Sequence, residues 1–107
     1  MTNPIPTRTT EQRREALEKA VIARKKRAEV RMKLEKGTLG LDDVLDSKDE
    51  AIRRMKIYDL LRAYRGIGDR KAYVILDRLG IAVSRRVAGL GAHQRKRLKD
   101  FIAQREN

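Results

Sequence analysis

The sequence contains no cysteine and no tryptophan, and only 4% of its residues are aromatic. Without cysteine there is no disulfide framework and no thiolate metal site. The scarcity of aromatic residues leaves a thin core of aliphatic side chains and argues against recognition of single-stranded nucleic acid by base stacking. We expect the core to contain four large rings: Tyr58, Tyr64, Tyr73 and Phe101.

Membrane-spanning and secretion signals are also missing. No apolar run approaches the length needed to cross a membrane. The N-terminus lacks the basic and then apolar pattern of a secretion signal. With 107 residues the chain is long enough for one small domain, and we expect a cytoplasmic protein without a membrane partner.

The chain is strongly basic, with a formal net charge of +12 and 39% charged residues. The charge is uneven, because residues 1–36 carry +6, residues 37–59 carry −2 and residues 60–107 carry +8. Two basic ends around a slightly acidic middle indicate two cationic surfaces, which favours nucleic acid as the partner. The alternative is that lysine and arginine only keep exposed helices soluble.

A long basic helix is expected over residues 9–37, after a flexible basic arm at residues 1–8. Thr9 followed by Gln12 is a capping-box pattern, no helix breaker follows before Lys36, and Gly37 supplies a stop. The helix has a sparse apolar stripe: Leu17, Ala20, Val21, Ala28 and Met32. Such a stripe covers little of a helix, so we expect much of this one to be exposed.

Residues 38–107 are expected to form a compact helical domain, because apolar and polar residues never alternate for long. The expected helices cover residues 41–46, 50–55, 56–64, 69–79 and 92–105. Ser47 and Asp69 are the expected N-caps of the second and fourth of these, and Gly80 ends the fourth. The predicted fold class is therefore all-α.

Two glycine-bracketed turns connect the last three helices. In the first, Gly66 and Gly68 enclose Ile67, which we expect to plug the core while the glycines turn the backbone outward. Free amides at the start of the next helix can bind a phosphate. Arg70 and Lys71 lie in the first turn of this helix, where the helix dipole makes positive side chains unfavourable. A bound phosphate would offset this unfavourable interaction. The alternative is an ordinary connection. We expect Gly68→Val to disrupt the turn and the fold.

The second turn repeats this arrangement, with Leu90 between Gly89 and Gly91. Cationic side chains flank it on both sides: Arg85, Arg86, His93 and Arg95. Arginine makes bidentate contacts with phosphate, so this flank is predicted to bind the phosphate backbone of a nucleic acid.

No catalytic or metal site is predicted. His93 is the only histidine, and no cysteine or acidic residue stands at ligand spacing from it. The sequence also shows no combination of a nucleophile, a base and an orienting group of the kind that a catalytic site needs. We therefore expect no cofactor and no enzymatic activity.

A second nucleic-acid surface is one interpretation of the long helix. Its candidates are four basic residues: Arg24, Lys25, Arg27 and Arg31. Basic residues this close together point in several directions around a helix. The alternative is therefore a solvated helix stabilised by local pairs such as Glu15–Lys19.

Segments along nearly the whole chain carry a family resemblance. They are Glu11-Gln12-Arg13, Ala16-Leu17-Glu18-Lys19-Ala20, Ala23-Arg24, Arg27-Ala28-Glu29, Met55-Lys56, Leu60-Leu61, Gly66-Ile67-Gly68, Ile81-Ala82, Arg85-Arg86, Gly89-Leu90-Gly91 and Gln94-Arg95-Lys96. The order of helix, turn, helix, turn and helix resembles the helix–two-turns–helix motif of a small-subunit ribosomal protein and of formamidopyrimidine-type DNA glycosylases. In these segments the sequence is most similar to the actinobacterial integration host factor family.

The resemblance implies a non-enzymatic, monomeric nucleoid protein that binds double-stranded DNA with little sequence preference. Such proteins bend or compact DNA and assist phage site-specific integration, so an integrase complex is a further implied partner. Carried over by position, the phosphate contacts are the backbone at Gly66, Gly68, Gly89 and Gly91, with Arg85 and Arg86. Relatives often place arginine or lysine where Ala88 stands, so His93 or Arg95 would replace part of that contact.

Two alternatives stay open. An RNA-binding or ribosome-associated protein could use the same motif on folded RNA. The second alternative is a trimmed DNA glycosylase. Those enzymes share an N-terminal proline nucleophile and, usually, a zinc finger. Here Thr2 occupies the second position and there is no cysteine.

Overall fold

The computed structural model describes residues 9–106, and the regular structure in that part of the chain is helical. Its elements are α1 (Thr10–Lys36), α2 (Leu41–Leu45), α3 (Glu50–Arg53), α4 (Ile57–Arg62), α5 (Asp69–Leu79), the 3₁₀ helix η1 (Val87–Gly89) and α6 (Ala92–Glu106). The strand-like contact in this part is an isolated antiparallel bridge between Lys56 and Arg86. The all-α prediction is confirmed, and the arm predicted at residues 1–8 lies outside the described residues.

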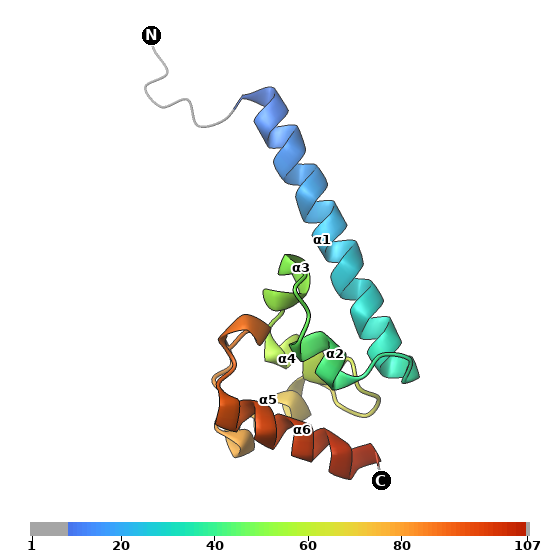
Figure 1. Cartoon of the computed structure of the whole chain (residues 1–107), viewed down its shortest axis with the longest axis vertical. Helices are drawn as coiled ribbons and strands as arrows, with labels where there is room; N and C mark the ends of the chain where they lie inside the picture. Colours follow the sequence, from blue (N-terminus) through green and yellow to red (C-terminus); the bar gives the residue numbers. More distant parts are fainter. Residues whose placement is uncertain (1–8, 107) are drawn as a thin grey trace.

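Helix α1 projects beyond the compact body along much of its length (Figure 1). Thr9 begins it with the predicted capping box, because Thr9 Oγ1 accepts from Gln12 N at 3.1 Å and Gln12 Oε1 accepts from Thr9 N at 3.0 Å. Gly37 ends it in the left-handed conformation, with a φ of +77°. The molecule is consequently elongated, with extents of 64, 27 and 25 Å.

The face of α1 that packs is not the predicted apolar stripe. Its buried residues are Val30 and Leu34, and a row of half-buried residues at spacings of three and four continues the same face: Ala16, Ala20, Ala23 and Arg27. The three alanines line a groove between α1 and α3. Lys26 links the two helices by an ion pair to Asp49, with a 3.0 Å separation between Nζ and Oδ2.

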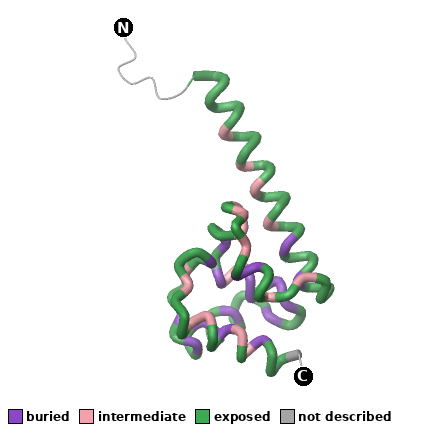
Figure 2. The backbone as a smooth tube through the Cα atoms, viewed as in Figure 1, coloured by how far each residue is buried: buried purple, intermediate pink, exposed green. Residues whose placement is uncertain are grey.

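The predicted stripe lies mainly on the exposed side of α1. Leu17 is 67% exposed, Met32 is 49% exposed, and Val21 and Ala28 also face solvent. Apart from Ala20, that prediction was wrong. The reason is that α1 meets the core only through its last turns, where Val30 and Leu34 are buried, so the apolar side chains farther along the helix have no core to pack against. The expected exposure of the helix is confirmed (Figure 2).

The body encloses an aliphatic core. Its largest fully buried side chains are Val44, Met55, Ile57, Leu60, Leu61, Leu76 and Leu98. Ile67 is buried as well, which confirms its predicted role as a plug. Val30 and Leu34 belong to the same cluster, so the last turns of α1 share this core.

The four aromatic rings differ in burial. Tyr64 is buried, Tyr58 and Phe101 are half-buried and packed against the core, and Tyr73 is 49% exposed. Placing Tyr73 in the core was wrong. It lies on the flank of α5, where its ring meets that of Tyr58 with 4.8 Å between the centroids.

The helices after α1 match the predicted ranges to within two residues at each end, and two predicted N-caps were wrong. Asp49 rather than Ser47 caps α3, since Asp49 Oδ1 accepts from Ala51 N at 3.0 Å. Gly68 rather than Asp69 precedes α5, so Asp69 is the first helical residue. Gly80 ends α5 as predicted.

Candidate nucleic-acid interface

The first glycine turn presents the start of α5 to solvent. Gly66 has a φ of +87°, a conformation that favours glycine, and Ile67 is buried beside it. The first hydrogen bond of α5 runs from Ala72 N to Gly68 O at 3.0 Å. The amides of the first helical turn therefore have no intrahelical acceptor, as predicted.

The other three glycines of the two turns have ordinary backbone conformations. Gly68 has a φ of −94°, and no atom lies within 4 Å of the position that a β-carbon would take. The structure thus gives no steric reason for Gly68→Val to break the fold, because the backbone is extended and the space around a β-carbon is open. Gly89 and Gly91 also lack a positive φ.

A carboxylate already lies at the positive end of α5. Asp69 accepts from Arg62 Nε at 2.8 Å and from the Tyr58 hydroxyl at 3.1 Å. Partial burial of Tyr58 and its hydrogen bond to Asp69 raise the pKa of this tyrosine to about 12. Arg70 and Lys71 are exposed beside Asp69, and both cations face solvent. The Asp69 carboxylate offsets part of the unfavourable interaction between these cations and the helix dipole.

In the second turn the glycine amides are engaged. Gly89 N donates to Arg86 O at 2.9 Å, and Gly91 N donates to Gln94 Oε1 at 3.1 Å. The amides without an intrahelical acceptor are instead those of residues 92–94, at the start of α6. A phosphate at this turn would meet helix amides rather than the glycine amides we predicted.

Arg85 and Arg86 are oriented by backbone carbonyls. Arg85 Nη1 donates to Gly89 O at 2.9 Å, and Arg86 Nη1 donates to Arg54 O at 2.7 Å. Two backbone hydrogen bonds of 2.9 Å with residues 55–57 fix the segment that carries them. A carbonyl positions a guanidinium without cancelling its charge, so both side chains keep free N–H donors for an anion.

The remaining predicted contacts of the second turn differ from each other. His93 is exposed at the start of α6. Arg95 Nη2 lies 2.6 Å from Asp46 Oδ1 and 3.7 Å from Asp42 Oδ1, so it ties α6 to α2. Lys99 Nζ, 2.8 Å from Asp42 Oδ1, is the main cause of the lowered pKa of that carboxyl. Arg95 therefore offers a phosphate less charge than Arg85 or Arg86.

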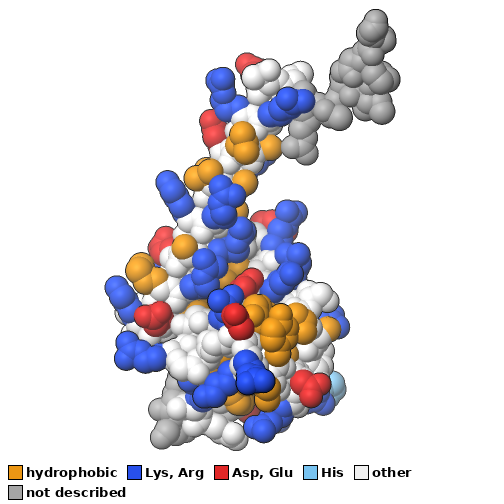
Figure 3. All heavy atoms as spheres, turned by 180° about the vertical axis from the view of Figure 1, so that it is seen from behind, with side chains coloured by type: hydrophobic (Ala, Val, Ile, Leu, Met, Phe, Trp, Pro, Cys, Tyr) orange, Lys and Arg blue, Asp and Glu red, His pale blue; other side chains and the backbone are white. Residues whose placement is uncertain are grey.

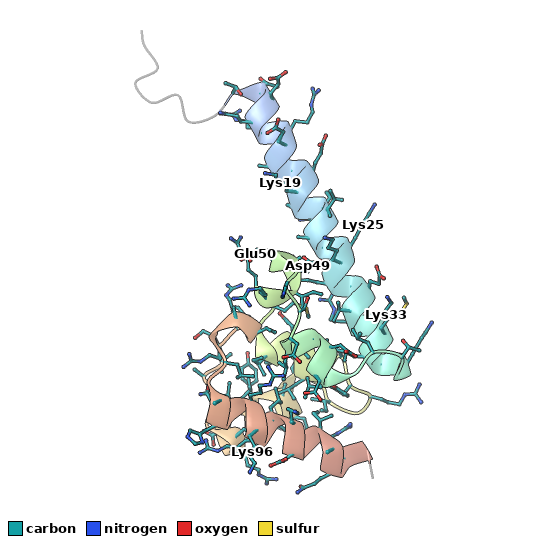
Figure 4. All side chains as sticks on the ribbon, viewed as in Figure 1. Lys19, Lys25, Lys33, Asp49, Glu50 and Lys96 are labelled. Atoms are coloured by element: carbon teal, nitrogen blue, oxygen red, sulfur yellow. The ribbon has the colours of Figure 1, made fainter. Side chains whose placement is uncertain are left out.

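Two of the four predicted cations on α1 face α3. Arg24 and Arg27 line a groove of ≈ 730 Å³ between α1 and α3, and Arg54 joins them from the other wall. Arg31 and Lys25 are exposed and do not line this groove, and Lys25 points away from α3 (Figure 4). The four cations thus do not form a single surface.

The basic side chains are distributed over both parts of the molecule. Figure 3 shows lysine and arginine along α1 and onto the body, with hydrophobic side chains exposed between them. Some carboxylates lie in ion pairs, such as Glu29 with Lys33 at 2.8 Å and Glu50 with Arg54 at 3.1 Å. These exposed pairs stabilise the fold little and leave a positive surface overall.

A second groove, which sequence reasoning missed, is continuous with the first. It has a volume of ≈ 440 Å³, and Arg27 and Arg54 line both grooves. Tyr58 and Tyr73 supply its aromatic surface, and the Arg62 guanidinium lies 5.4 Å from the centre of the Tyr58 ring. Nothing in the sequence signals this groove, because its tyrosines come from different helices and fit the core pattern of each.

The described residues contain no group of three or more histidine or acidic side chains that could hold a metal ion. In the same part of the chain, no helix has the length and apolar character needed to cross a membrane.

The chain is similar to known proteins over most of its length. A family model described as an S13-like H2TH domain matches residues 32–101. An integration host factor from Mycolicibacterium smegmatis is 45% identical over 102 residues, which are 94% of this chain and 97% of that protein. The chain belongs to the actinobacterial integration host factor family. The predicted family and the predicted helix–two-turns–helix motif are both confirmed.

Further members of the family agree with this assignment. The integration host factor of Streptomyces coelicolor is 44% identical over 92 residues, which cover 84% of this chain and 86% of that protein. The solved structure of sIHF bound to an 8 bp palindromic DNA has a TM-score of 0.76 and 40% identity. The match covers 78% of this chain and 97% of that one.

Proposed function

We propose that this protein is an architectural protein of the nucleoid that binds duplex DNA through its phosphate backbone, with little sequence preference, and bends or compacts it. The observation that carries the proposal is the pair of guanidiniums of Arg85 and Arg86, held by carbonyls with their charges free. The similarity to sIHF, whose solved structure contains DNA, supports duplex DNA as the ligand.

The contacts follow from the chemistry of the two turns. Amides at the starts of α5 and α6 donate to phosphate oxygens, and Arg70, Lys71 and His93 add exposed donors beside them. Arg85 and Arg86 supply bidentate contacts, while Arg95 is largely committed to α2. Phosphate contacts position a protein on DNA without reading bases, which accounts for weak sequence preference.

The groove between α1 and α3 supplies a second DNA surface. Arg24 and Arg27 line it, together with Arg54, which the sequence analysis did not single out and which is paired with Glu50 of the same lining. Two surfaces on one monomer can hold one bent duplex or bring two duplexes together. By this route the protein assists site-specific integration alongside a phage integrase complex, without a cofactor or catalysis of its own.

A gel-shift titration with random-sequence duplex DNA at several salt concentrations tests this proposal. Contact with about six phosphates should lower the affinity about a thousandfold between 50 and 200 mM salt. A scrambled-sequence panel should bind equally well within a fewfold range. Weak binding with little salt dependence would remove the proposal.

Structured RNA is the second candidate ligand, because the matching family model is described as S13-like and the related motif occurs in a ribosomal protein. Unlabelled structured RNA added to the same titration separates the two. Duplex binding that survives an excess of RNA supports the DNA proposal, whereas displacement by RNA assigns the protein to the ribosomal alternative.

A further inference from the structure

The groove beside α5 combines aromatic surface with unneutralised cations. Tyr73 is 49% exposed although it lies next to the half-buried Tyr58, and Val83 beside them is 45% exposed. Arg27 enters from α1 and Arg86 from the segment before η1. The scarcity of aromatic residues argued against base stacking by the chain as a whole, but here an exposed ring and positive charge share one concave site, like the surfaces on which unpaired nucleotides stack.

The bridge between two chain segments concentrates charge at this site. Lys56 and Arg86 are paired across the bridge and both line the groove. Like charges directly opposite each other destabilise such a pairing, so an anion between them would relieve a cost built into the fold. Asp59 is the acidic residue of this lining, against the cations Arg27, Lys56 and Arg86, and Arg54 in the same lining is paired with Glu50.

The tyrosine pair is arranged to receive a further ring. The Tyr58 ring has the Arg62 guanidinium 5.4 Å away and the Tyr73 ring 4.8 Å away, tilted by 39°. Asp69 accepts from both Tyr58 and Arg62, which fixes this inner part. Tyr73 is the outer member, and its exposed surface faces the groove rather than the core.

We propose that this groove binds an unpaired nucleobase stacked on Tyr73, with the adjoining phosphates held by Lys56 and Arg86. The strand leaving the site continues along the α1–α3 groove, because Arg27 and Arg54 line both. The inference rests on the proposed function only in taking DNA as the ligand. It adds a preference for strands with a bulge, gap or opened base step, which duplex phosphate contacts do not give.

The test compares two DNAs that differ at one place: an intact short duplex, and the same duplex with two unpaired nucleotides at its centre, one of them 2-aminopurine. We expect about tenfold tighter binding to the bulged DNA, and a change in 2-aminopurine fluorescence on binding, because stacking on one aromatic side chain is of about that strength. Tyr73→Ala should abolish both the preference and the fluorescence change. Tyr73→Phe should retain both, because the ring remains.

Val74→Ala is the matched control, since Val74 is a neighbouring exposed residue of α5, 54% exposed, that does not line the groove. Thermal unfolding of each variant shows that it is folded. Bulged DNA is also more flexible, and flexibility alone would favour it equally in every variant. A preference that survives Tyr73→Ala therefore overturns the inference.

Equal affinity of the natural protein for both DNAs also overturns it, and would leave the groove as a docking surface for an acidic protein. The intact duplex is an internal measure of the proposed function. If the protein binds neither DNA, the proposed function fails. If it binds the intact duplex and does not prefer the bulge, only this inference fails.

Discussion

Two arginines show how much the anchoring of a side chain matters at the scale of single residues. Arg85 and Arg95 both stand by the second turn, yet Arg85 is held by a carbonyl at 2.9 Å and Arg95 by a carboxylate at 2.6 Å. A carbonyl leaves the guanidinium charge intact, whereas a carboxylate cancels much of it. Two arginines at similar positions in the sequence therefore differ in the positive charge that they offer to a phosphate.

Replacing Arg85 and Arg86 together with alanine should weaken binding to all duplex sequences about equally. Each lost phosphate contact lowers the salt slope by about one, so the double variant should lose about two. Arg78→Ala is the control, because this exposed arginine lies at the end of α5, away from both turns. Binding isotherms on several sequences measure the effect, and a loss confined to one sequence would contradict backbone contact.

The Tyr58 hydroxyl should titrate far above a free tyrosine. Its pKa of about 12 arises from partial burial and the hydrogen bond to Asp69, against an ordinary value of 10.0. The raised pKa means that folding favours the protonated form. This contribution to stability is complete below pH 10 and is lost as the pH rises towards 12.

Tyrosinate absorbance during an alkaline titration measures this effect. The natural protein should show a component near 12 that Tyr58→Phe lacks, and Asp69→Asn should move that component downwards. Identical titration curves for the natural protein and Tyr58→Phe would refute the assignment.

At the scale of elements, the two turns contain glycines with different roles. Only Gly66, with a φ of +87°, has a conformation that other residues rarely adopt. Gly66→Ala should lower the free energy of unfolding by about 1 kcal/mol, since an alanine there occupies the left-handed region. Gly68→Ala should change it by less than about 0.5 kcal/mol, because its backbone is extended and its surroundings are open. Denaturant unfolding of both variants measures the difference, and equal losses would contradict this reading of the turns.

The ends of the helices could be predicted from the sequence, because capping depends on a few neighbouring residues. Thr9 with Gln12, Gly37 and Gly80 all act as predicted. The packing face of α1 could not be predicted from the sequence, because it depends on where the helix contacts the rest of the fold. Val30 and Leu34 are buried only because the body lies against the last turns of α1, and the alanines at 16, 20 and 23 line the groove that α3 forms with the helix.

The candidate site was predictable in part for the same reason. The two turns and Arg85 and Arg86 stand in local motifs that can be recognised along the chain. Which amides are free, and that Arg95 pairs with Asp46, depend on hydrogen bonds between distant segments. The groove of Tyr58 and Tyr73 needs α4 and α5 to be brought together, so a sequence pattern places both rings in the core.

At the scale of the whole molecule, the net charge of +12 is divided between the projecting helix and the body. Arg24→Ala with Arg27→Ala removes two cations from the α1–α3 groove while the turns stay intact. The salt slope for duplex binding should fall by about two if this groove holds phosphates. Lys36→Ala, at the far end of α1, is the control of equal charge type. An unchanged slope in the double variant would show that DNA contacts only the turns.

The elongated shape can be compared with the repeat of the double helix. One turn of B-DNA advances about 34 Å, so the 64 Å long axis corresponds to nearly two turns, or about 19 base pairs. Points separated by whole turns lie on the same side of a duplex. A molecule aligned with the DNA axis would therefore neutralise one side only, and the unscreened phosphates opposite would repel each other and curve the duplex towards the protein. Copies placed in phase with the helical repeat would add their curvatures in one plane.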